Sequence, residues 1–142
     1  MRRAWARWRA LSYDEKKCLL WMLILLPMIS AMLRVFGFHR SHGWLQRASQ
    51  PKLFIDADTT TLQLAERLAR LADIAGQRGL VKATCLRQAM LLQWLLRRRQ
   101  LDANLKIGTR LRDGEFDAHA WVELQGIALG QTEINHQAFD RW

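Results

Sequence analysis

The sequence is poor in cysteine, proline and acidic residues. Two cysteines in 142 residues, Cys18 and Cys85, are too few for a disulfide framework, so packing must hold the fold together. A reducing, cytoplasmic compartment is therefore expected. The 13 Asp and Glu residues are outnumbered by 22 Lys and Arg residues, which gives a net charge of +9 and is compatible with an acidic partner surface.

Several motifs for catalysis and ligand binding are absent as well. There is no phosphate-binding glycine loop, no CxxC pair and no HExxH sequence. His39 and His42 lie three residues apart, but no Cys, Asp or Glu adjoins them to complete a ligand set, so we expect solvated loop histidines. We therefore expect no cofactor and no metal. We also expect no nucleic acid as a partner, because no basic strand carries clustered aromatic residues.

The hydrophobic content is sufficient for one folded domain. Half of the residues are hydrophobic, which is too many for a disordered chain. We expect residues 1–50 to form a basic tail, an apolar helix and a connector that begins at Gly37. Residues 51–142 are expected to form the core domain.

The apolar helix is predicted from an uncharged run between Cys18 and Leu33. These 16 residues would span about 24 Å as a helix, which is less than the roughly 30 Å of a hydrocarbon core. We expect a buried or surface-docking helix, with a membrane anchor or a cleaved signal peptide as the alternatives. Pro27 is expected to kink this helix.

Two further helices are predicted downstream. Apolar residues at helical spacing predict a helix over about 61–76, which begins with a capping box over 60–63 and ends at Gly76 and Gly79. A second helix is predicted over 85–99. Because it is apolar over most of its circumference, we expect it to be central in the fold.

The last third of the chain changes to a period of two, which is typical of strands. Alternation from Ala103 predicts a half-buried strand, and the turn sequence at 113–114 predicts a hairpin to a second strand. The Gln125-Gly126 pair offers another turn into a short third strand. Helices followed by an antiparallel β-meander indicate an α+β fold.

Cys85 and His119 are the candidate catalytic pair. Cys85 is predicted in the first turn of a buried helix, where unpaired N–H groups and the positive end of the helix dipole stabilise a thiolate. His119 is predicted on a strand of the adjacent sheet, where a neutral imidazole can accept the thiol proton. The alternative is that Cys85, like Cys18 in the apolar run, is a small hydrophobic residue.

These residues belong to a set of motifs that resembles the lasso-peptide leader peptidases. Those are small cysteine peptidases of the transglutaminase-like superfamily. The resemblance covers about the last 60 residues in motif order and spacing. It is carried by Cys85-Leu86-Arg87-Gln88-Ala89, by 95–99, by Ile107-Gly108 and above all by His119-Ala120-Trp121-Val122-Glu123.

The resemblance implies a transglutaminase- or papain-like core with Cys85 as the nucleophile and His119 as the base. It also implies the reaction, which is removal of the leader from a ribosomally made precursor peptide before a separate cyclase closes the macrolactam ring. At 142 residues, we expect the chain to contain no additional leader-binding domain. It therefore resembles the stand-alone form of the peptidase. In that form of the family, a separate small recognition protein holds the leader of the precursor peptide.

A third catalytic residue is less clearly indicated. The family usually has an Asp on the strand after the histidine, and the matching position here is Gln131. A three-residue loop over 124–126 would pair Gln131 with His119, whereas a two-residue loop over 125–126 would pair Thr132 with it. Gln131 could orient the imidazole through its amide oxygen, and Glu133 or Asp117 could supply the missing charge.

Two further expectations concern binding. Trp121 could form a wall of the substrate cleft, or it could simply pack in the sheet. The apolar helix and the basic tail could contact a membrane surface, which would make the protein membrane-associated in the cytoplasm. The absence of the usual Asp also leaves a second hypothesis, in which the chain is an inactive basic adaptor that docks a peptide or lies on a membrane.

Overall fold

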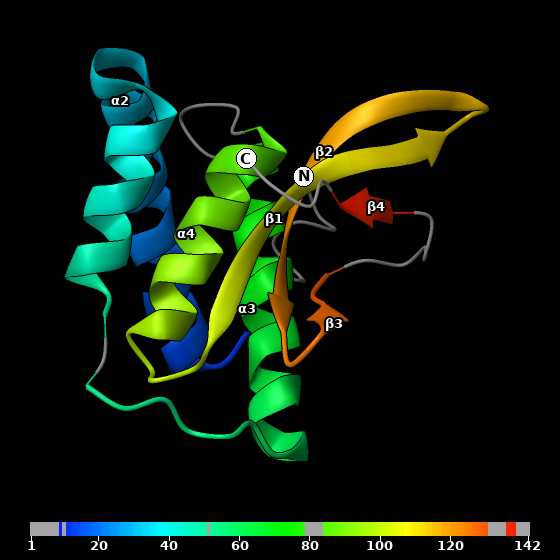
Figure 1. Cartoon of the computed structure of the whole chain (residues 1–142). Coiled ribbons are helices and arrows are strands. Elements are labelled where there is room, and N and C mark those ends of the chain that lie inside the picture. Colours follow the sequence, from blue (N-terminus) through cyan, green and yellow to red (C-terminus); the bar gives the residue numbers. More distant parts are fainter. Residues whose placement is uncertain (1–8, 10, 51, 79–83, 131–135, 139–142) are drawn as a thin grey trace.

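The computed structural model describes residues 9, 11–50, 52–78, 84–130 and 136–138. Three helices cover one side of a four-stranded antiparallel sheet (Figure 1). The helices are α2 (Tyr13–Ala48), α3 (Thr59–Arg78) and α4 (Cys85–Arg97). The strands are β1 (Ala103–Arg112), β2 (Glu115–Leu124), β3 (Ile127–Ala128) and β4 (His136–Ala138), in the order β3-β2-β1-β4. The predicted α+β arrangement is confirmed, but the sequence did not predict β4.

Helix α2 is longer than expected, because the predicted connector is helical up to Ala48. The helix begins at Ser12, whose side chain accepts from the Glu15 backbone N–H at 3.2 Å while the Glu15 carboxylate accepts from the Ser12 N–H at 2.8 Å. Its non-helical dihedral angles lie at Gly37, with φ 76° and ψ 174°. The break therefore lies at the glycine, which tolerates positive φ, and not at Pro27 as predicted.

Helix α3 confirms the predicted element but corrects both of its ends. The capping residue is Asp58, whose carboxylate accepts from the Thr61 backbone N–H at 2.7 Å, so the predicted capping box at 60–63 is wrong. Hydrogen bonding from the Thr61 side chain, together with that from its backbone N–H, lowers the pKa of Asp58. Gly76 lies inside the helix and does not end it, while Gly79 lies outside the described residues.

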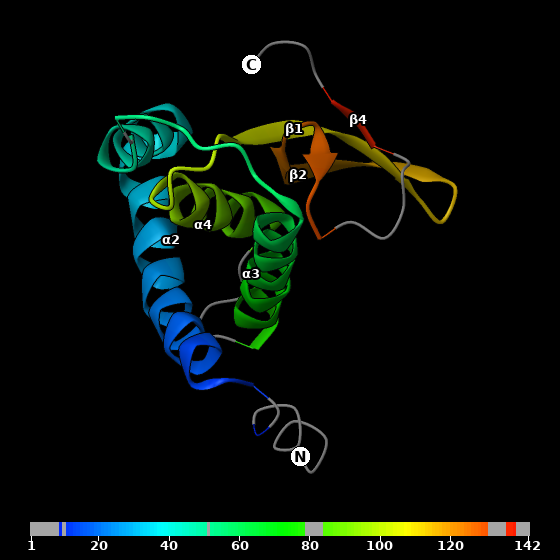
Figure 2. The ribbon, with the colours of Figure 1, turned by 90° about the horizontal axis from the view of Figure 1, so that it is seen from below.

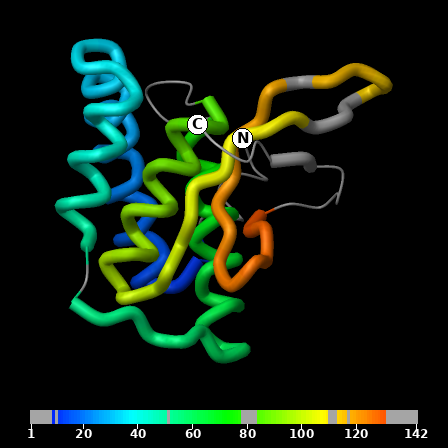
Figure 3. The backbone as a smooth tube through the Cα atoms, viewed as in Figure 1, coloured from blue at the N-terminus to red at the C-terminus, as the bar shows by residue number. Residues whose placement is uncertain are grey.

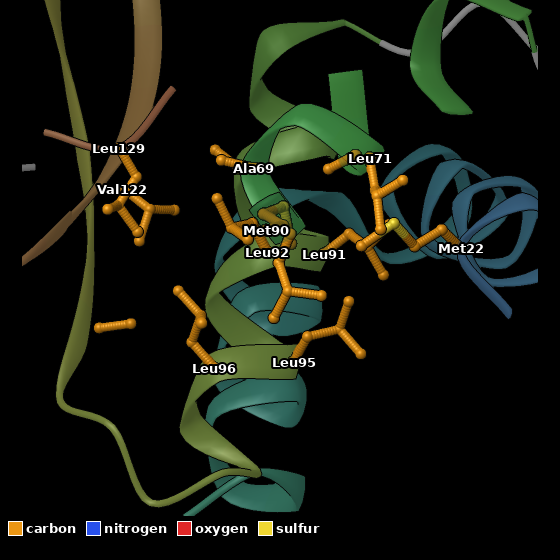
Figure 4. Close-up of a cluster of buried hydrophobic side chains, with 14 of the residues drawn as sticks. Met22, Ala69, Leu71, Met90, Leu91, Leu92, Leu95, Leu96, Val122 and Leu129 are labelled. Atoms are coloured by element: carbon orange, nitrogen blue, oxygen red, sulfur yellow. The ribbon is translucent and has the colours of Figure 1, made fainter. Parts of the chain in front are cut away.

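Helix α4 is the central helix, as its sequence predicts. It lies between α2 and α3 and against the sheet (Figure 2). Ala89, Met90, Leu91, Leu92, Gln93, Leu95 and Leu96 are all buried. Met22 of α2, Leu71 of α3 and Val122 of β2 belong to the same hydrophobic cluster (Figure 4). The helix ends at Arg97, two residues earlier than predicted, and Gln100 then takes a positive φ of 63°.

The two predicted turns set the register of the sheet. Asp113 and Gly114 both have positive φ and join β1 to β2. The tip of this hairpin extends beyond the helices (Figure 3). The second loop contains two residues, because Leu124 pairs with Ile127 and Glu123 with Ala128. The Leu129 N–H then donates to the Val122 carbonyl at 2.9 Å, which continues the same register. Of the two registers considered above, the structure has the two-residue loop.

His42 is buried, which contradicts the expectation of a solvated loop residue, whereas His39 is exposed. The His42 Nε2 atom lies 2.9 Å from Gln93 Oε1 of α4, and the Gln93 amide nitrogen donates to the Ala103 carbonyl at 3.2 Å. These two bonds connect the second half of α2 to α4 and to the start of β1. Burial lowers the pKa of His42.

We predict that the stability of the fold depends on pH through His42. The unfolded chain binds a proton at the ordinary histidine pKa of about 6.5, whereas the folded chain binds it only at lower pH. The free energy of unfolding should therefore fall as pH is lowered from about 6.5 towards the depressed pKa of the folded state. Urea unfolding at several pH values should show this slope reduced in His42→Gln and retained in His39→Gln. Equal slopes in both variants would contradict the assignment.

Candidate active site

A cavity of about 200 Å³ lies where α3, the first half of α4 and β2 meet. Alanines form much of its wall, and their small side chains leave the space open. The lining residues are Ala69, Ala72 and Asp73 of α3, Cys85, Gln88, Ala89 and Leu92 of α4, His119, Ala120, Trp121 and Val122 of β2, and Leu129 and Gly130. The cavity therefore contains both members of the predicted catalytic pair.

Cys85 is the first residue of α4, and its side chain is partly buried. The preceding Thr84 has extended dihedral angles, φ −69° and ψ 163°, and makes no side-chain hydrogen bond to the first turn. The N-terminal N–H groups of α4 are thus not capped by this hydroxyl. A helix N-terminus attracts negative charge, so this position suits a thiolate or a developing oxyanion.

His119 lies on β2 opposite Gly108 of β1 and is 7% exposed. Its ring stacks on Trp121, with centroids 5.8 Å apart and planes at 19°. The Trp121 indole nitrogen donates to Glu123 Oε1 at 3.1 Å. Residues 119, 121 and 123 share one face of the strand, because side chains alternate along it. On this face, Glu123 therefore holds the Trp121 indole, and the indole in turn holds the His119 imidazole.

Gln88 also lines the cavity, one helical turn after Cys85. Residues three apart share a face of a helix, so Gln88 and Cys85 lie on the same side of α4. The Gln88 side chain also packs over Gly76 of α3, where an added Cβ would overlap it. Gly76 is thus the residue that lets α3 approach this side of the cavity closely.

Asp73 of α3 lines the cavity, and Glu66 of the same helix contacts the lining residue Gly130. The Gly130 N–H donates to Glu66 Oε2 at 3.1 Å, and Gly130 has a positive φ of 68°. The Asp73 carboxylate accepts from the Gln77 amide nitrogen, at 3.0 and 2.9 Å. Asp73 is the acidic residue among the described lining residues.

Cys85, His119 and Trp121 all line this cavity. Gln131 and Glu133 lie outside the described residues, and so does Thr132. The observed two-residue loop would place Thr132, not Gln131, opposite His119 if the same pairing continued. Sequence reasoning missed Gln88 and Asp73. Gln88 could have been found from its position three residues after Cys85, whereas Asp73 depends on how α3 packs against α4.

The second cysteine, Cys18, lies apart from this cavity. It packs against the hydrophobic core from α2, and burial raises the pKa of its thiol. This agrees with the expectation that Cys18 is a small hydrophobic residue. Within the described parts of the chain, no three His, Cys, Asp or Glu residues are grouped to hold a metal ion.

A comparison with protein families identifies the fold. The family model described as the transglutaminase-like superfamily matches residues 22–141, which is more than half of the chain. The chain belongs to the transglutaminase-like superfamily. No curated protein and no solved structure gives a significant match.

Membership in the transglutaminase-like superfamily supports cysteine chemistry in this cavity. The superfamily generally contains cysteine peptidases and transglutaminases, and the observed helices and antiparallel sheet are consistent with it. Both kinds of enzyme begin with attack of a thiolate on a carbonyl carbon. The family thus agrees with a reactive cysteine and with a papain-like fold, and it leaves the substrate open.

We predict that Glu123 stabilises the fold through Trp121. Glu123→Leu removes the acceptor of the indole N–H and should lower the free energy of unfolding by about 1–2 kcal/mol, whereas Glu123→Gln retains an acceptor and should cost less. Urea denaturation measures both. Glu115→Leu, at an exposed acid on the same strand, is the matched control. Equal stability of Glu123→Leu and Glu115→Leu would show that the Trp121 bond contributes nothing.

Proposed function

We propose that this protein is a cysteine peptidase that removes the leader from a lasso-peptide precursor. The observation that carries the proposal is that Cys85, at the start of the central helix, and His119, on the adjacent strand, line one cavity. The ordered motifs around both residues support the more specific assignment to leader removal. A transglutaminase-like domain over residues 22–141 supports the general class of reaction.

In the proposed reaction, the Cys85 sulfur attacks the carbonyl carbon at the junction of leader and core. His119 accepts the thiol proton and then donates it to the leaving amine, so that the peptide bond breaks and a thioester forms on Cys85. Water next attacks the thioester, with His119 as the base again. The free carboxylate is released and the thiol is restored.

The negative charge on the carbonyl oxygen requires hydrogen-bond donors. The proposed donors are the backbone N–H of Cys85 and the side-chain amide of Gln88, because both belong to the first turn of α4 beside the cavity. Gly76 would contribute indirectly, since the Gln88 side chain packs over it. Gln131 and Glu133 remain the proposed partners that orient the His119 imidazole.

The proposed partners follow from the same reaction. A separate recognition protein would deliver the precursor peptide, and a cyclase would close the ring after cleavage. The net charge of +9 favours an acidic leader or an acidic carrier. Asp73, beside the cavity, would instead favour a basic group of the bound peptide near the scissile bond.

A cleavage assay tests this proposal. The substrate would be a short precursor with Thr near its junction, to be sought in the coding sequence beside this gene together with a cyclase that resembles asparagine synthetase, and it would be incubated with its recognition protein. Mass spectrometry should detect free leader with the native chain. Cys85→Ala should abolish the product, and His119→Ala should reduce its rate by at least about a hundredfold.

The amide of Gln88 gives a finer prediction. Gln88→Ala should lower the cleavage rate by about tenfold to a hundredfold, because loss of one oxyanion donor weakens transition-state stabilisation. Gln63→Ala, at an exposed glutamine of α3 outside the cavity lining, is the control and should leave the rate almost unchanged. Binding of the precursor without cleavage, unaffected by Cys85→Ala, would favour the inactive adaptor instead.

A further inference from the structure

Helix α2 exposes an apolar stripe along its first part, which runs from Tyr13 to the break at Gly37. At 100° per residue, the exposed positions fall within an arc of about 100° on one side of the helix. Ile24 is 63% exposed and Val35 is 70% exposed, so these side chains are not merely at the edge of the core. The stripe consists of Tyr13, Leu20, Trp21, Ile24, Met28 and Val35.

The opposite side of the same helix is buried in the protein. Its inward residues have exposed fractions between 0% and 9% and belong to the main core. Figure 2 shows the first half of α2 at the edge of the helical layer, with α3 and α4 on one side only. The inward residues are Leu19, Met22, Leu25, Leu26 and Ile29.

These two faces decide between crossing a membrane and lying on one. By length and composition, α2 is apolar enough to cross a membrane, with a mean hydropathy of 2.1 over its most apolar window. To cross it, however, the helix would have to withdraw Met22 and Ile29 from the core. A helix that lies flat would bury its outer stripe in lipid and keep its inner face on α3 and α4.

The charges beside the stripe identify the surface that it fits. Lys17 lies on the stripe near its first end, and Arg34 flanks the other end, whereas no acidic residue lies between them. Across the break at Gly37, the exposed rings of Phe36 and Trp44 lie with their centroids 4.8 Å apart, and Arg40 and Arg47 lie beside Trp44. Aromatic rings and long basic side chains are typical of helices that lie at the interface of an anionic bilayer.

We propose that the outer face of α2 docks this protein in the plane of an anionic lipid surface. The stripe supplies apolar contact, and the basic residues at its ends attract phospholipid headgroups. The proposal does not depend on the peptidase reaction. It places the cavity on a protein that is held at a membrane surface without a spanning segment.

Flotation of the full chain with vesicles tests this docking. The chain should float with vesicles of phosphatidylglycerol and phosphatidylcholine, and high salt should weaken binding because it screens the basic residues. Ile24→Asp should weaken binding by about tenfold or more, since it places a carboxylate in the stripe. Ile74→Asp on α3, where the isoleucine is 38% exposed, is the matched control and should bind like the native chain.

Other results would overturn the proposal. They are absence of flotation, flotation that Ile24→Asp does not weaken, or binding to pure phosphatidylcholine as strong as binding to the anionic vesicles. The remaining alternative is that a second copy of the chain packs on the stripe, and light scattering without lipid tests it. A dimer that Ile24→Asp dissociates would support this alternative. Circular dichroism of both Asp variants verifies that they are folded, which is expected because both positions are exposed.

Discussion

Burial of helix α4 on all sides fixes the rest of this molecule. Seven of its residues are buried, and they contact α2 and α3 on one side and the sheet on the other. Met90, Leu91 and Leu96 are at most 1% exposed. Each such side chain contributes about 1.5–3 kcal/mol on burial, so the position of this helix is strongly determined. Cys85 begins this helix, and its place at the edge of the core follows from that packing.

The histidine is positioned by the other partner of α4, the sheet. Ala120, Val122 and Leu124 of β2 pack into the core, and this anchors the strand that carries His119 on its alternate face. Trp121 and Glu123 then support the imidazole on that same face. The proposed nucleophile and the proposed base therefore come from two elements that share one core. Substitutions in that core should affect both the stability of the fold and the geometry of the pair.

Much of this arrangement is encoded locally in the sequence. The helices α3 and α4 and the β1–β2 hairpin follow from periodicity and from the turn at 113–114. The C-terminal part of α2 does not, because its composition is typical of a connector. Burial of Leu45 and the hydrogen bond between His42 and Gln93 stabilise the helix there instead. Strand β4 has only three residues and pairs with β1 across a long separation, so no local pattern indicates it.

The candidate site shows the same division. Cys85 and His119 stand in recognisable motifs, and their meeting at one cavity follows from a helix and a strand that pack together. Gln88 and Asp73 enter the cavity only because α3 crosses α4 closely at Gly76, and this is a tertiary contact that no single segment specifies. The possible third catalytic residue lies in the segment after Gly130. Its identity therefore depends on how the chain pairs with β2 after Leu129, where the observed β2–β3 pairing ends.

The central claim is that His119 activates Cys85, and alkylation of Cys85 tests it most directly. The measurement is the rate of reaction with iodoacetamide at pH 6 to 9 in a Cys18→Ser background, with His119→Ala and, as control, His39→Ala. An assembled pair predicts reaction already near pH 6, a rate at least about tenfold lower in His119→Ala, and no change in His39→Ala. Equal rates with and without His119 would contradict the account and would favour an inactive adaptor of the same fold.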